Sequence, residues 1–95
     1  MTHYFKRYWE ETTGDELTDA WGTSTYYFET DEQLNVIRQM QVFEKGQVLK
    51  YHIDFMDDEF GMLADQKLDK DEFEEFAVGE TEFTSMWSEL KRKTI

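Results

Sequence analysis

The sequence contains no cysteine and no proline, and basic residues are few. Without cysteine there is no disulfide and no thiolate chemistry, and the common zinc sites lose their usual ligands. No apolar run approaches the roughly 18–20 residues of a membrane span, and no secretory leader precedes the structural residues. We therefore expect a cytoplasmic protein without membrane contact, folded as a single domain over residues 1–95.

Acidic residues are abundant instead. There are 22 Asp and Glu against 10 Lys and Arg, for a net charge of −12. Nucleic acids and anionic membranes carry the same sign, so direct binding to them is disfavoured, whereas a basic protein would be attracted. Twelve acids and only two lysines lie between Asp54 and Glu82. This stretch is either a solvated surface or a binding edge.

The pattern of apolar residues predicts an α+β fold, namely an antiparallel β-meander of about four strands with a C-terminal α-helix packed on one face. Aromatics make up 17% of the chain and favour the pleated state. The strands are expected at residues 4–11, 23–30, 36–44 and 47–55. The helix is indicated by Phe83, Met86, Trp87 and Leu90, which follow the i, i+3, i+4, i+7 spacing.

Local signals predict where the turns and helices begin. Gly46 tolerates the positive φ of a tight hairpin turn. Asp69 and Gly79 occupy N-cap positions, each with a Glu three residues later. The basic residues 91–93 are expected to close the C-terminal helix, where cations favour the negative end of its dipole.

The hairpin register follows if the loop is the two residues Lys45 and Gly46. Met40 then faces Tyr51 and Val42 faces Leu49, which collects apolar side chains on one face. The other face is predicted to be mixed, with Gln39, Gln41, Lys50 and His52 beside Ile37, Phe43 and Val48.

Large apolar groups on both faces imply that the second face also needs a cover. One candidate is the loop of residues 12–22, which carries Leu17 and Trp21. The alternative is an exposed aromatic patch that forms a protein interface or a homodimer.

Candidate chemical sites are few. His52 and Asp54 share a strand face, but their predicted neighbours suggest a solvated surface without a nucleophile in reach. The acids of residues 54–59 lack the spacing of an EF-hand, and no phosphate-binding glycine motif is present. We therefore predict no catalytic residue, no metal site and no cofactor, and classify the protein as a non-enzyme.

Several runs resemble a family of small acidic uncharacterised bacterial proteins that share a domain of unknown function. They are residues 21–31 (WGTSTYYFETD), 36–39 (VIRQ), 43–46 (FEKG) and 82–87 (EFTSMW). The resemblance covers most of the chain, rests on turns, strand pairs and a helix anchor, and implies an immunity-protein-like role.

The sequence thus predicts a non-enzymatic binding module for a basic protein partner, such as an immunity protein or inhibitor. The alternatives are a nucleic-acid-mimicking inhibitor, or a small-molecule-binding domain or enzyme with a pocket between sheet and helix. The predicted contact residues are acids with two aromatic anchors: Asp54, Asp57, Asp58, Glu59, Asp69, Asp71, Glu72, Glu75, Trp21 and Tyr27.

Overall fold

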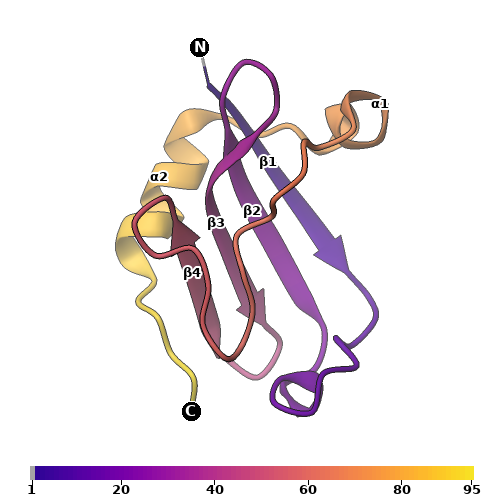
Figure 1. Cartoon of the computed structure of the whole chain (residues 1–95), viewed down its shortest axis with the longest axis vertical. Helices are drawn as coiled ribbons and strands as arrows, with labels where there is room; N and C mark the ends of the chain where they lie inside the picture. The colour runs from indigo at the N-terminus through magenta and orange to yellow at the C-terminus, as the bar shows by residue number, and fades with distance from the viewer. Residues whose placement is uncertain (1) are drawn as a thin grey trace.

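Four antiparallel strands form a meander in the order β1-β2-β3-β4 in the computed structural model, which describes residues 2–95 (Figure 1). The strands are β1 (His3–Trp9), β2 (Ser24–Thr30), β3 (Val36–Phe43) and β4 (Val48–His52). The helix α2 (Glu80–Glu89) follows near the C-terminus and packs on one face of the sheet. The predicted fold class is confirmed.

Three short helical turns complete the elements, and both predicted N-caps are in place. They are η1 (Asp19–Trp21), α1 (Lys70–Phe73) and η2 (Glu74–Phe76). The Asp69 carboxylate accepts the backbone N–H groups of Asp71 (2.9 Å) and Glu72 (3.3 Å), which satisfies two donors of the first turn of α1. Gly79 is the N-cap of α2.

The predicted register of the β3–β4 hairpin is wrong by one residue. Met40 lies opposite Lys50, and Val42 lies opposite Val48. The loop has three residues, because the Phe43 N–H donates to the Gln47 carbonyl (2.8 Å). Gly46 closes this loop with a φ of 99°, a conformation that three-residue hairpins also require.

The corrected register gives the sheet two buried faces. On the face that α2 covers, here called the helix face, Tyr27, Met40, Val48 and Phe83 are buried together. The opposite face is crossed by residues 53–69, here called the crossing segment, which run back over the strands (Figure 1). On this crossing face the buried core includes Phe28, Phe43, Leu49, Tyr51, Leu63 and Phe73.

The cover of the second face is therefore mainly the crossing segment and α1. The loop of residues 12–22 contributes at one end, where the Trp21 ring packs edge-on against Phe43 (5.0 Å between centroids) and beside Phe60 (5.3 Å). Leu17 remains exposed. The predicted loop therefore covers only part of the face.

Both sheet edges are partly paired by short segments. The Val48 backbone exchanges two hydrogen bonds with Lys93 at 2.8 Å each, on the outer side of β4. On the outer side of β1, the Val78 N–H donates to the Tyr4 carbonyl (2.9 Å).

The cation at the end of α2 differs from the prediction. The helix ends at Glu89, and residues 91–93 leave it in an extended conformation. The Lys50 ammonium from β4 donates instead to the carbonyls of Trp87 (2.7 Å) and Leu90 (3.0 Å). A cation does meet the negative end of the dipole, but it comes from the sheet beneath the helix.

Within residues 2–95, no helix combines the length and the apolar character that a bilayer crossing requires.

Candidate functional site

A groove of about 540 Å³ lies on the crossing face, between the crossing segment and strands β1 to β3. It is on the opposite side of the sheet from α2, whereas the sequence suggested a pocket between sheet and helix. Its aromatic wall comes from Trp9, Tyr26, Phe28 and Phe73. The remaining lining is mostly polar: Arg7, Glu11, Thr12, Thr13, Ser24, Gln39, Gln41, Met62 and Ala64.

Two buried glutamines of β3 form the floor of the groove. The Gln39 side-chain amide donates to the Met62 carbonyl (3.0 Å) and accepts the Ala64 N–H (2.8 Å). It thus gives the crossing segment the donor and the acceptor that the backbone of a neighbouring strand would otherwise provide. The Gln41 amide donates to the Ser24 hydroxyl (2.9 Å). Gln39 thus holds one wall of the groove to its floor.

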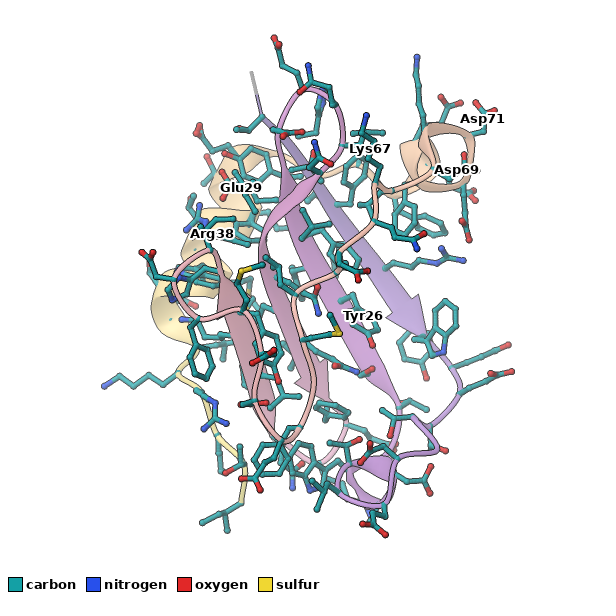
Figure 2. The ribbon with its side chains drawn as sticks, in the orientation of Figure 1. Tyr26, Glu29, Arg38, Lys67, Asp69 and Asp71 are labelled. Atoms are coloured by element: carbon teal, nitrogen blue, oxygen red, sulfur yellow. The ribbon has the colours of Figure 1, made fainter. Side chains whose placement is uncertain are left out.

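Tyr26 lines the groove from β2, beside the crossing segment (Figure 2). Its ring stacks on Phe28 with 5.4 Å between centroids. Burial raises the pKa of the Tyr26 hydroxyl, so the group is neutral at physiological pH. No group within residues 2–95 makes a hydrogen bond with this hydroxyl, which leaves it free for a bound molecule or water.

Arg7 separates the groove from the outer edge of β1. Its guanidinium lies 5.0 Å from the ring centroids of Phe73 and Phe76 and 5.1 Å from that of Trp9. Its Nη1 donates to Glu72 (2.8 Å). The Arg7 charge is thereby neutralised and held among aromatic rings.

The predicted acids fall into two separate groups rather than one surface. Asp57, Asp58 and Glu59 line a shallow depression together with Asp15 from the 12–22 loop. The second group lies at α1 and η2: Asp69 is the N-cap of α1, α1 contains Asp71 and Glu72, and η2 contains Glu75. Figure 2 shows Asp69 and Asp71 at the outer end of α1. Asp54 lies in the turn that follows β4.

Some of these acids are engaged within the fold, and others are free. Asp69 caps α1, and Glu72 pairs with Arg7. Asp58 is only 14% exposed and pairs with Arg92. Among the described residues, five predicted contact acids are exposed and lie in no ion pair: Asp54, Asp57, Glu59, Asp71 and Glu75.

Asp58 is the centre of a polar cluster that anchors the crossing segment. Its Oδ1 accepts the Tyr51 hydroxyl (2.7 Å) and the N–H groups of Phe60 (2.9 Å) and Gly61 (3.2 Å), and Oδ2 accepts Arg92. Burial by itself raises the pKa of Asp58, but the hydrogen bonds from Tyr51, Arg92 and Phe60 outweigh it and hold that pKa below its ordinary value. Burial, helped by the bond to Asp58, raises the pKa of Tyr51.

The two predicted aromatic anchors belong to the core and are removed from the candidate surface. Trp21 is 9% exposed and packs against Phe43, and Tyr27 is 5% exposed and lies under α2. The exposed aromatic residues among those described are Tyr8 and Trp9 of β1 and Phe55 of the crossing segment. Adjacent strand positions alternate between the two faces of the sheet, so the number of aromatic residues does not indicate which of their rings are buried.

His52 is not oriented by the Asp54 carboxylate. The contact is a hydrogen bond from the Asp54 backbone N–H to Nδ1 of His52 (3.2 Å), and the imidazole lies edge-on to Trp87 (6.3 Å). In the part of the chain that the structure describes, no three carboxylate or imidazole groups gather as they would around a metal ion.

Sequence reasoning missed the groove because Gln39 and Gln41 were interpreted as a solvated face. Both are buried, at 5% and 6% exposure. The available signal was their position at alternate places of a strand whose other residues, apart from Arg38, are apolar. An amide has both donors and acceptors, so it suits a buried strand face that meets irregular backbone.

Comparison of the chain with models of protein families, with curated proteins and with solved structures finds no match.

Proposed function

We propose that this protein is a non-enzymatic binding module for a basic protein partner, and that it acts as an immunity protein or inhibitor does. One observation carries the proposal: exposed carboxylates without ion pairs border the aromatic groove on two sides. Met62 lines both the groove and the depression of Asp57 and Glu59. On the other side, Glu11 lines the groove directly, is exposed and lies in no ion pair among the described residues.

This arrangement suits a partner surface that presents cationic side chains around an apolar or aromatic one. The net charge of −12 accelerates association with a basic protein, and the acids beside the groove favour its correct orientation. The aromatic wall offers apolar area and cation–π contacts at the centre, where interface energy usually concentrates.

The test is a pull-down with the whole chain as bait, at low and high salt, followed by mass spectrometry. The double variant Asp57→Asn/Glu59→Gln is compared with the matched variant Glu80→Gln/Glu89→Gln, which removes the same charge from α2. We expect a basic partner that high salt releases, with at least roughly tenfold weaker binding to the first variant than to the second. A captured protein whose binding changes neither with salt nor with the Asp57→Asn/Glu59→Gln substitution contradicts the proposal.

A second candidate function, binding of a small molecule, is favoured by the size of the groove. Its 540 Å³ lies within the roughly 300–1,000 Å³ of ligand sites, and the unpaired Tyr26 hydroxyl and the Gln41 amide supply polar contacts. A fragment titration followed by NMR distinguishes the two functions. Resonance shifts confined to Tyr26 and Gln41 support a small molecule.

Nucleic-acid mimicry is tested separately, by adding DNA to the complex with a captured protein. Displacement of that protein by DNA indicates mimicry.

A further inference from the structure

The outer edge of β1 is covered along only its first half. The Val78 N–H donates to the Tyr4 carbonyl (2.9 Å), and Ala77 lies opposite Phe5. These two residues behave as a short added strand, so this edge already accepts strand pairing. Beyond them β1 continues to Trp9, and no other segment within residues 2–95 pairs with that half.

Free backbone groups face outward along this second half. Alternate residues of a strand direct their N–H and C=O to the same side, so those of Lys6 and Tyr8 face outward as those of Tyr4 do. The bridge between Phe5 and Ala77 sets Lys6 opposite Phe76, so the free half of the edge is the part around Tyr8. Within residues 2–95, no hydrogen bond engages the outward N–H or C=O of Tyr8. Such an edge is a template for another strand.

A depression of about 340 Å³ lies along the same half of the strand. Its lining is Arg7, Tyr8, Trp9, Glu10, Glu11 and Phe76. Arg7, Trp9 and Glu11 also line the groove on the crossing face, so the depression and the groove adjoin. Tyr8 (60% exposed) and Trp9 (41% exposed) point to opposite faces and would flank an incoming strand on both sides.

The charges around this edge favour a basic strand. The two cations of the strand are already paired, Lys6 with Glu82 (3.5 Å) and Arg7 with Glu72 (2.8 Å). Glu10 and Glu11 are exposed and lie in no ion pair among the described residues. A second copy of the chain would bring the same two acids and a charge of −12 to the edge, which disfavours self-pairing.

We infer that the free half of β1 binds an extended basic segment of the protein partner as an added strand. The inference rests on the proposed function and adds the mode of recognition. The partner backbone pairs with Tyr8, its Lys or Arg side chains meet Glu10 and Glu11, and an apolar side chain packs on Trp9.

The test is an NMR titration of the whole chain with a short synthetic peptide of alternating lysine and valine. A peptide of alternating glutamate and valine is the control. We expect the lysine peptide to shift the Tyr8 amide resonance and to slow its hydrogen exchange, and the glutamate peptide to bind at least roughly tenfold more weakly.

Two variants examine the edge in different ways. Tyr8→Pro removes the outward N–H, and the β1–β2 ladder is retained because proline is tolerated where an edge N–H faces solvent. Glu10→Lys/Glu11→Lys leaves the backbone unchanged and reverses the local charge. Both should weaken peptide binding by roughly tenfold, whereas Glu80→Lys/Glu89→Lys on α2 should change it by less than about threefold.

Other outcomes overturn the inference. These are the absence of peptide binding, shifts centred on α1 or the crossing segment, or a dimeric light-scattering mass with Tyr8 protected before peptide is added. A captured partner that binds the Tyr8 and Glu10/Glu11 variants normally but loses affinity for Asp57→Asn/Glu59→Gln overturns the edge inference and leaves the proposed function standing. If peptide binds at Tyr8 but no basic protein is captured, the proposed function fails instead.

Discussion

The two faces of the sheet are covered in different ways. On the helix face, α2 places Phe83 over Tyr27 and Met40, and Phe83 is fully buried. On the crossing face, irregular backbone lies over the strands and is held by hydrogen bonds with the Gln39 amide and by the Tyr51 hydroxyl, which donates to Asp58 of the segment.

The difference reflects how the helix and the crossing segment each satisfy the hydrogen-bonding groups of their own backbone. A helix pairs its N–H and C=O groups internally, so it needs only apolar side chains to pack against a sheet. An irregular segment leaves such groups unpaired and needs partners from its surroundings. The crossing face therefore carries buried polar residues, and the groove lies among them.

The largest loss of stability should follow from a cavity under the helix. Phe83→Ala removes a ring at 0% exposure and is expected to lower the free energy of unfolding by about 3–5 kcal/mol. Urea unfolding at neutral pH measures it, with the exposed Ser85→Ala on the same helix as the control, expected within about 0.5 kcal/mol. A loss below about 1 kcal/mol would mean that α2 contributes little to the core.

Asp58→Asn should cost less and should depend on pH. At pH 7 the substitution weakens the charge-assisted hydrogen bonds from Tyr51 and Arg92. We expect the free energy of unfolding to fall by about 2–3 kcal/mol. The folded pKa of Asp58 is below its ordinary value of 3.8, so the unfolded chain binds the proton first as pH falls.

The stability that Asp58 contributes is therefore complete above its ordinary pKa and is lost as pH falls through the lowered one. Urea unfolding of wild type and Asp58→Asn should differ at pH 7 and converge in the acid range. The exposed Asp57→Asn serves as the control, with little change at neutral pH. A gap between wild type and Asp58→Asn that stays constant from pH 7 into the acid range would contradict the anchoring role.

The smallest effect is expected at Gln39, where a local readout is sharper than overall stability. Gln39→Met leaves the Met62 carbonyl and the Ala64 N–H without their partner. We expect the free energy of unfolding to fall by about 1–2 kcal/mol. Hydrogen exchange of the Ala64 amide should accelerate in this variant. It should be unchanged in Gln41→Met, since Gln41 bonds the Ser24 side chain instead. Equal acceleration in both variants would show that the crossing segment is not held by Gln39.

Local signals in the sequence were sufficient for the elements themselves. The strands, the Asp69 cap and the apolar stripe of α2 follow from alternation, capping chemistry and helical spacing, which involve neighbours within a few residues. The hairpin register was not decided locally. A glycine with positive φ closes two-residue and three-residue loops alike, so Gly46 could not choose between them.

The wrong register came from the expectation that one face would be the apolar one. It grouped Met40 with Tyr51, whereas in the structure Met40 lies under α2 and Tyr51 lies under the crossing segment. Both faces are covered here, so each can accept apolar residues, and the strongest constraint on register disappears. The candidate site was affected in the same way, because Trp21 and Tyr27 entered the core.

The sequence by itself determined the composition of the surface, the order of the elements and the α+β class, because these depend on charge and on short-range periodicity. Tertiary structure alone decided which acids stay free, that Asp58 anchors the crossing segment, and that the groove adjoins the open half of β1. These outcomes depend on contacts between residues far apart in the chain. Asp58 and Arg92, 34 positions apart, meet only after the crossing segment and the residues that follow α2 have packed on the sheet.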